Sequence, residues 1–155
     1  MASFTGVQRR FQIKGEAGGV TVVDDYGHHP EEIKATLSAA RNAWDKRVIA
    51  VFQPHRYTRT RDLFNDFLKA FYQADTVILT DIYAAGEDPI EGGKAERLYE
   101  GIKEHGHRDV HFFPEKERLA SELLKIVREG DMVITLGAGD IWKAGEELLD
   151  RLKER

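Results

Sequence analysis

Apolar residues recur along this chain in two patterns, strict alternation near the amino end and helical spacing or short apolar runs further on. Residues 7–16 alternate between apolar and polar side chains, which predicts a strand with one exposed face. A glycine-containing turn at 15–19 follows, and residues 20–23 return as a second strand. The chain is therefore expected to open with a β-hairpin.

The remaining pattern alternates strands with helices. Pro30 suits the first position of a helix, and Ile33, Leu37, Ala40 and Trp44 then recur at the spacing that gives a helix one buried face. A continuous apolar run at 48–52 is typical of a central parallel strand that is covered on both faces. The further predicted strands are 76–80, 110–113 and 131–136, and the further helices are about 60–74, about 94–105, 114–128 and one after residue 140.

The resulting order, ββαβαβαβαβα, predicts an α/β fold. We expect a Rossmann-like three-layer sandwich, in which helices cover both faces of a mostly parallel six-stranded sheet. The first strand of the hairpin should be the one antiparallel strand. Residues 6–155 are predicted to form a single domain, and residues 1–5 are interpreted as a residual linker or a cloning remnant.

Composition narrows the class of protein. The 155 residues are 41% hydrophobic and 32% charged, as in an ordinary globular domain. There is no cysteine, so the chain has no disulfide, thiolate metal site or thiol nucleophile. The net charge of −4 does not favour nucleic acid as a partner, and no apolar run approaches the roughly 20 residues of a membrane span.

A polar cluster follows the second predicted strand, where ligands bind in parallel α/β sheets. Asp24 and Asp25 could accept hydrogen bonds from ribose hydroxyls, hold a metal or cap the next turn, but alternation sends them to opposite faces. His28 and His29 are loop neighbours, and such neighbours seldom converge on one metal. The stretch therefore predicts a binding loop, with structural capping as the equally weighted alternative.

A basic cluster follows the strand at 48–52. Arg56, Arg59 and Arg61 lie in the loop and first helical turn, where a cation opposes the helix dipole at a cost of about 0.3–1 kcal/mol each. An anionic ligand or partner would offset that cost, because a guanidinium grips carboxylates and phosphates in two places. The alternative is a solvated helix start in which Arg61 pairs with a nearby acid. Lys46 and Arg47 extend the basic segment in sequence.

Several catalytic motifs are absent from the chain. There is no GxxxxGK[ST] phosphate loop and no GxSxG nucleophile elbow, and the glycines at 137–140 lack the remaining glycine of a dinucleotide fingerprint. We therefore expect no catalytic residue and no metal ligand in this chain alone.

Five stretches of the chain form one ordered set of motifs: 6–12, 24–30, 53–63, 83–87 with Pro89 and Ile90, and 136–141. In these stretches the chain resembles the carboxyl-terminal domain of the Mur ligases, which are ATP-dependent amino-acid ligases. The motif QPHRYTRTRDLF, which begins at Gln53, favours the branch that joins L-alanine to UDP-N-acetylmuramate over a related branch that recycles muramyl peptides.

The resemblance implies a cytoplasmic three-domain enzyme. Its first domain would bind the UDP-sugar, its central domain would bind ATP and magnesium, and the third, represented here, would close over both. The carboxylate would become an acyl phosphate that L-alanine attacks, so this fragment alone is expected to be inactive. The resemblance assigns nucleotide contacts to Arg10 and Asp25, and amino-acid or phosphate contacts to Tyr26, His28, His55, Arg56 and Arg59.

Two other functions remain as alternatives. The paired acids would also suit a stand-alone anion-binding or receiver-like regulatory module, for which Asp81 follows the third parallel strand but no suitable lysine follows the fifth. A histidine–carboxylate metal hydrolase is the other, with His55 joining the two loop histidines.

Overall fold

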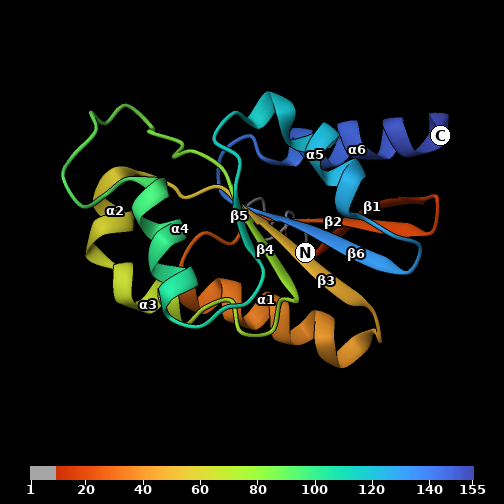
Figure 1. Ribbon diagram of the computed structural model, residues 1–155, viewed down its shortest axis with the longest axis horizontal. Helices are drawn as coiled ribbons and strands as arrows, with labels where there is room; N and C mark the ends of the chain where they lie inside the picture. Colours follow the sequence, from red (N-terminus) through yellow and green to blue (C-terminus); the bar gives the residue numbers. More distant parts are fainter. Residues whose placement is uncertain (1–9) are drawn as a thin grey trace, which may run out of the picture.

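The computed structural model describes residues 10–155, which form one six-stranded sheet with helices on its two faces (Figure 1). The strand order across the sheet is β1-β2-β6-β3-β4-β5. The predicted linker at 1–5 lies outside the described residues. The strands are β1 (Gln12–Ala17), β2 (Val20–Asp25), β3 (Arg47–Phe52), β4 (Thr76–Leu79), β5 (Val110–Phe112) and β6 (Asp131–Leu136).

The pairing of the strands confirms the predicted sheet. β1 pairs with β2 antiparallel, while β2 with β6, β6 with β3, β3 with β4 and β4 with β5 are all parallel. Because β6 lies between β2 and β3, the last strand of the chain fills the middle of the sheet.

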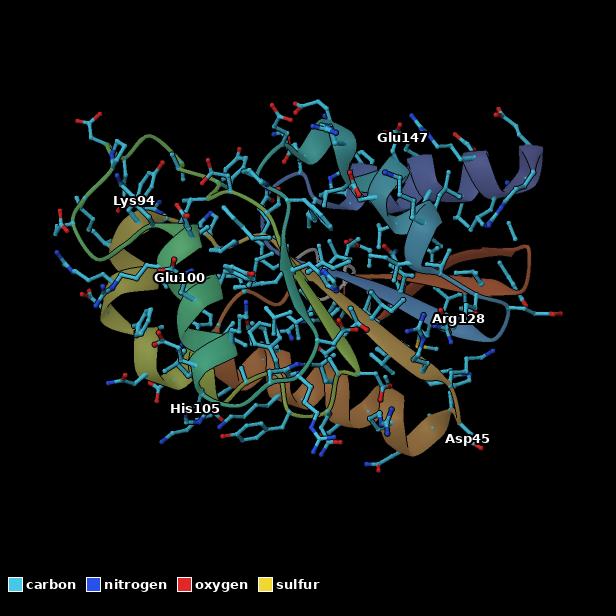
Figure 2. The ribbon with its side chains drawn as sticks, in the orientation of Figure 1. Asp45, Lys94, Glu100, His105, Arg128 and Glu147 are labelled. Carbon is cyan, nitrogen blue, oxygen red and sulfur yellow. The ribbon has the colours of Figure 1, made fainter. Side chains whose placement is uncertain are left out.

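The helices divide between the two faces. α1, α3 and α4 pack on one face, and α5 and α6 pack on the other, above the sheet in the view of Figure 1. Charged side chains such as Glu147 on α6 and Glu100 on α4 point away from the sheet (Figure 2). The helices are α1 (Pro30–Ala43), α2 (Tyr57–Asp62), α3 (Phe64–Leu68), α4 (Ala95–Glu104), α5 (Leu119–Ile126) and α6 (Trp142–Glu154), with a 3₁₀ turn, η2, at Lys116–Arg118.

β3 shows how one sheet supports two cores. Val48, Ala50 and Phe52 point into the core beneath α1 and α3, whereas Ile49 and Val51 point into the core beneath α5 and α6. All five are essentially inaccessible to solvent, so the apolar run correctly predicted a strand covered on both faces.

α1 begins and packs as its sequence predicts. Pro30 occupies the first turn, where no backbone hydrogen bond is lost, and Ile33, Leu37 and Ala40 are fully buried. Trp44 ends the helix and stacks on Phe11 with 5.2 Å between ring centroids. That stacking connects the segment before β1 to the end of α1.

The predicted first strand differs from the observed one. β1 begins at Gln12, continues to Ala17, and contains a bulge between Ile13 and Gly15, so the turn is confined to residues 18–19. The bulge breaks the two-residue alternation, and Ile13 is 55% exposed although the pattern placed it on the buried face.

The predicted helix at 60–74 is also wrong in its continuity. α2 starts earlier, at Tyr57, and the helix breaks at Leu63, whose φ of −106° and ψ of 19° separate α2 from α3. The apolar spacing is nevertheless satisfied, because Phe67 and Phe71 both pack on Phe52 at 5.4 Å. Spacing therefore identified the buried side chains but not the interruption of the helix.

Another predicted helix, 114–128, is shorter than expected. Pro114 and the residue after it lie outside any helix, the chain then makes the 3₁₀ turn η2, and α5 covers only Leu119–Ile126.

The basic segment of the sequence is divided by the strand within it. Arg47 lies at the amino end of β3, and its Nε and Nη2 donate to the Asp131 carboxylate at 3.1 and 2.8 Å. Since β3 rises about 3.3 Å per residue, Arg47 is at the opposite end of the sheet from Arg56. The hydrogen bonds to Asp131 raise the pKa of Arg47, so this charge serves the fold rather than an anion site.

We predict that Asp131→Asn destabilises the domain by about 2 kcal/mol, because it leaves the Arg47 guanidinium facing a neutral amide in a partly buried position. Urea unfolding measures the effect. The matched control is Lys34→Gln, which removes the exposed pair with Glu31 and should cost less than about 0.5 kcal/mol. Equal effects of the two substitutions would contradict the structural role of Arg47.

Candidate functional site

The carboxyl ends of four parallel strands bring the polar loops of the chain to one edge of the sheet. The backbone joins them directly, since Gly137 N–H donates to the Asp25 carbonyl at 3.2 Å and Gln53 N–H donates to the Leu136 carbonyl at 3.0 Å. The loops 26–29, 53–56, 80–84 and 137–140 therefore meet here. This is the edge at which α/β sheets bind ligands.

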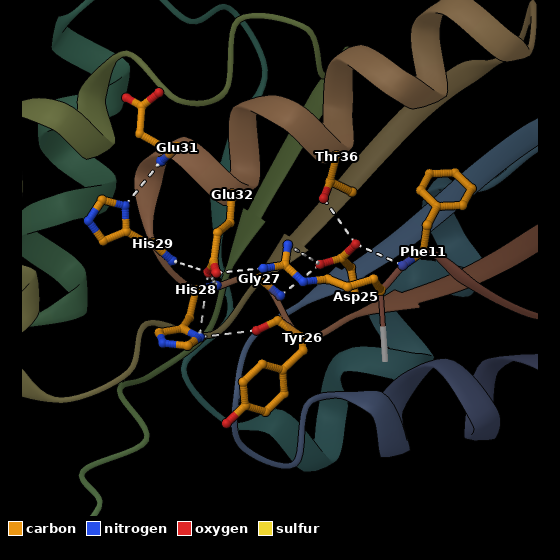
Figure 3. A network of polar contacts seen from close by, with 10 residues as sticks. Phe11, Asp25, Tyr26, Gly27, His28, His29, Glu31, Glu32 and Thr36 are labelled. Carbon is orange, nitrogen blue, oxygen red and sulfur yellow. Dashed lines mark hydrogen bonds and ion pairs between the residues drawn. The ribbon is translucent and has the colours of Figure 1, made fainter. Parts of the chain in front are cut away.

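Asp24 and Asp25 face opposite sides of the sheet, as alternation predicts. Asp24 accepts a hydrogen bond of 2.7 Å from the Thr135 hydroxyl on β6. Asp25 points toward α1 and accepts from the N–H groups of Phe11 and Gly27, at 2.8 and 2.7 Å, and from the hydroxyl of Thr36 at 3.0 Å (Figure 3). Each carboxylate has a role within the fold.

Asp25 also helps to position Arg10, the other residue predicted to contact the nucleotide. Arg10 Nη1 lies 3.9 Å from Asp25 Oδ1, and Nη2 donates to Glu32 Oε2 at 2.6 Å. Only 1% of Asp25 is exposed, whereas Arg10 is exposed to solvent. The guanidinium is thus the accessible member of this cluster, and a ribose contact by Asp25 stays a prediction.

The histidine loop is held by the start of α1. Glu32 Oε1 accepts from the backbone N–H groups of His28 and His29, both at 3.1 Å (Figure 3). Burial alone would raise the pKa of Glu32, but these hydrogen bonds and the nearby Arg10 charge bring it below its ordinary value. His28 Nδ1 donates to the Tyr26 carbonyl at 3.1 Å, which fixes the ring within the loop.

Four aromatic rings form a row that joins the two predicted binding loops. Tyr26 meets His28 edge-on at 5.4 Å, His28 lies 5.2 Å from His55, and His55 stacks on Tyr83 at 5.8 Å. The structure thus brings together Tyr26, His28 and His55 from segments almost thirty residues apart. Tyr83 was not singled out from the sequence, although it belongs to a stretch that carries the family resemblance.

His55 and its arginine neighbours form the positively charged part of this edge. Arg59 Nη1 donates to His55 Nδ1 at 3.4 Å, so the acceptor nitrogen carries no proton. Burial lowers the pKa of His55, and the charges of His28, Arg59 and Arg56 lower it further. A neutral His55 and two cationic guanidiniums are therefore expected at neutral pH.

The amino end of α2 already holds an anion that belongs to the chain. Glu87 accepts hydrogen bonds from the N–H groups of Tyr57 and Thr58 and from the Thr58 hydroxyl, and these bonds lower the pKa of Glu87. Glu87 therefore supplies an internal anion at this helix start, and an external anion bound by Arg56 and Arg59 stays a prediction. Arg61 takes the simpler alternative and pairs with Asp62 on the surface at 2.9 Å.

The glycine turn at 137–140 packs tightly against its neighbours. A Cβ on Gly139 would lie 2.5 Å from the Tyr83 ring, so the close approach of that ring requires glycine. Beside it, Gln53 Nε2 donates to Asp140 at 3.0 Å and Lys116 Nζ donates to the same carboxylate at 2.6 Å. A cavity of about 370 Å³ lies next to this network, lined by Gln53, Thr80, Asp81, Ile82, Tyr83, Ala84, Pro114, Glu115, Lys116 and Glu117.

Glu32 and Glu87 were not singled out from the sequence, and only Glu32 carries a recognisable sequence signal. Glu32 stands three positions after His29, which is the spacing of a capping box, so its bond to the loop follows a known local rule. Glu87 gave no such signal, because it reaches α2 from a loop thirty residues away.

In residues 10–155, no three His, Cys, Asp or Glu side chains converge as metal ligands. None of the helices in that range is long and apolar enough to cross a membrane.

Comparison with known proteins identifies the family. The model for "Mur ligase, glutamate ligase domain" matches residues 9–139. A UDP-N-acetylmuramate–L-alanine ligase from Geotalea daltonii is 62% identical over 152 residues, which cover 98% of this chain and 33% of that protein. A relative from Geobacter sulfurreducens with the same name is 58% identical over 154 residues, covering 99% of this chain and 33% of its own length.

A solved structure agrees with these relatives. UDP-N-acetylmuramate-alanine ligase from Thermotoga maritima superposes with a TM-score of 0.75 at 26% identity, over 94% of this chain and 30% of that one. The chain thus spans about a third of the length of the relatives that it matches. From the family match over 9–139 and the agreement in fold, we conclude that the chain belongs to the Mur ligase family, as its glutamate ligase domain.

Proposed function

We propose that this chain is the carboxyl-terminal domain of an ATP-dependent ligase that joins L-alanine to UDP-N-acetylmuramate during peptidoglycan precursor synthesis. The names and the 58–62% identity of the relatives from Geotalea daltonii and Geobacter sulfurreducens support this substrate pair. In that reaction the muramoyl carboxylate takes the γ-phosphoryl group of ATP to give an acyl phosphate and ADP. The amine of L-alanine then attacks the acyl carbon, and phosphate leaves the tetrahedral intermediate.

The observation that carries the proposal is an open cationic wall, which we define as Arg56 and Arg59 beside His28 and His55. Within residues 10–155, neither guanidinium forms an ion pair with a carboxylate. The wall stands at the carboxyl ends of the strands, and the adjoining cavity is lined by none of its four residues. Arg56 is exposed, whereas Arg59, His28 and His55 are half-buried, and a wall of this kind suits a site that another domain completes.

Each residue of the wall fits a step of the reaction. Arg56 and Arg59 would bind the carboxylate of L-alanine and the charge that develops on the phosphate, with charge-assisted bonds of roughly 1.5–3 kcal/mol each. His55, neutral at working pH, would hold Arg59 by accepting its N–H. Tyr26 and His28 would line the boundary between the amino-acid and nucleotide sites.

The nucleotide side of the site would use Arg10, which Asp25 and Glu32 hold at the surface. ATP, magnesium and the UDP-sugar would be held mainly by the amino-terminal and central domains of the parent enzyme, which bring the phosphate loop that this sequence lacks. Magnesium supplies charge neutralisation at the transferring phosphoryl group when bound there. We place the reaction in the cytoplasm, where ATP and the nucleotide sugar are made.

The receiver-like alternative is not favoured. Asp81 does follow the third parallel strand, but its Oδ1 accepts from Ile82 N–H at 2.8 Å. Lys116, which lines the same cavity as Asp81, donates to Asp140 instead. Incubation with acetyl phosphate should therefore leave the intact mass unchanged.

The experiment that tests the proposal compares the chain alone with a chimera, in which the chain replaces the segment that it matches in the Geotalea daltonii ligase. The chain alone should not form ADP from ATP, UDP-N-acetylmuramate and L-alanine, because the phosphate loop is absent. The chimera should form ADP and the ligated product. Turnover by the isolated chain, or an inactive but folded chimera, would overturn the proposal.

Variants of the chimera test the cationic wall directly. Arg59→Gln should reduce kcat/KM for L-alanine by about 10- to 100-fold, since one charge-assisted bond to an anion is lost. Arg61→Gln is the matched control, because Arg61 lies on the same helix but pairs with Asp62. Equal losses in both variants would show that α2 folding, rather than an anion contact, is responsible.

A pH dependence follows from His55. Its pKa is lowered in the folded state, so the unfolded chain binds more protons as the pH falls below about 6.5, and the free energy of unfolding decreases. His55→Gln removes this contribution. We predict that the stability lost between pH 7.5 and pH 5.5, measured by urea unfolding, is smaller in this variant than in the unsubstituted chain, by up to about 1 kcal/mol. An unchanged loss in this variant would contradict the burial of a neutral His55.

A further inference from the structure

Glu32 uses its two carboxylate oxygens for two different segments of the chain. Oε1 accepts from the backbone N–H groups of His28 and His29 (Figure 3), and Oε2 accepts from Arg10 Nη2 at 2.6 Å. Arg10 precedes β1, the histidine loop follows β2, and Glu32 is in the first turn of α1. One side chain therefore joins the arginine on the nucleotide side to the loop on the amino-acid side.

This double contact exceeds what helix capping requires. The capping box of α1 is complete with the bond from His29 N–H to Glu32 Oε1 and the bond from Glu31 N–H to the His29 ring. The second oxygen is not needed for the cap. It is directed at Arg10, and with 2.6 Å it makes a shorter contact than the 3.9 Å between Arg10 and Asp25.

The surroundings restrict how far this arrangement can change. A Cβ on Gly27 would lie 2.9 Å from Asp25 Oδ1 and 3.2 Å from Glu32 Cβ, so the loop is packed against both acidic residues. Asp25 binds the backbone of the segment before β1 and of the histidine loop, because it accepts from the N–H groups of Phe11 and Gly27. Asp25 thus fixes the backbone and lies 3.9 Å from Arg10, whereas the hydrogen bond that directs the Arg10 side chain goes to Glu32.

The energy of the Arg10–Glu32 pair argues for orientation rather than stability. Their side chains are 38% and 30% exposed, and ion pairs with such exposure contribute little to folding. An arginine held in one rotamer before its ligand arrives, however, loses less conformational entropy on binding. The Arg10–Glu32 pair is therefore expected to contribute more to the affinity for a ligand than to the free energy of folding.

We propose that Glu32 is a positioning residue, which holds Arg10 ready for the nucleotide and ties it to the loop of Tyr26 and His28. The proposal rests on the proposed function, in which Arg10 contacts the nucleotide. Contact between Arg10 and ATP would then be transmitted to the histidine loop through the Glu32 carboxylate.

The test uses the Geotalea daltonii chimera with Glu32→Gln. The amide oxygen of glutamine still accepts from the His28 and His29 N–H groups, whereas its NH₂ group cannot accept from Arg10. We expect the KM for ATP to rise about fivefold, with the KM for L-alanine and the thermal midpoint nearly unchanged. Glu31→Gln, which removes the neighbouring exposed acid, is the matched control and should change neither KM.

The direction of the change separates positioning from simple electrostatics. Removal of a negative charge near a polyanionic nucleotide would, by Coulomb attraction alone, lower the KM for ATP. A lower or unchanged KM in Glu32→Gln would therefore overturn the proposal. If the unsubstituted chimera itself fails to turn over, the proposed function fails, which is a different outcome.

A double-mutant cycle shows whether Glu32 acts through Arg10. Arg10→Gln alone should raise the KM for ATP, and adding Glu32→Gln to it should cause no further rise, because the residue to be positioned is gone. Independent effects that multiply in the double variant would show that Glu32 acts by another route and would contradict the proposal.

Discussion

The rest of this site depends on the hydrogen bonds made by one carboxylate, which is buried at the end of β2. Asp25 is 1% exposed, and an ionised group in such a position is tolerated only when hydrogen bonds replace its hydration. Its donors come from three segments: Phe11 before β1, Gly27 after β2 and Thr36 on α1. Satisfying this one charge fixes the entry to β1, the direction of the histidine loop and the docking of α1.

The strand order of the sheet brings the histidine loop and the loops after β3 and β4 to one surface. Because β6 fills the space between β2 and β3, the loops after β2 and β3 are two strands apart, close enough for the rings of His28 and His55 to meet at 5.2 Å. Tyr83 arrives from the loop after β4 and completes the row. Glu87 accepts hydrogen bonds from the start of α2, and Arg56 and Arg59 are the charges that we propose for an external anion.

Sequence patterns predicted the features that depend on local or periodic constraints. The buried face of α1, the two-sided burial of β3 and the antiparallel β1 follow from apolar spacing and from chain order. The break at Leu63 and the exposed Ile13 could not be predicted, because a bulge and a helix interruption change the backbone without changing the apolar pattern. The pairing of Arg47 with Asp131 and the capping by Glu87 join residues far apart in sequence, and only the folded sheet brings them together.

We propose that the edge of the sheet formed by the loops after β2 and β3 is one wall of a site that other domains complete. Hydrogen–deuterium exchange on the Geotalea daltonii chimera, with and without a non-hydrolysable ATP analogue and UDP-N-acetylmuramate, measures this most directly. The ligands should slow exchange at residues 26–29 and 55–60 in the chimera and leave exchange in the isolated chain unchanged. Unchanged exchange at both segments in a chimera that binds its ligands would contradict this proposal.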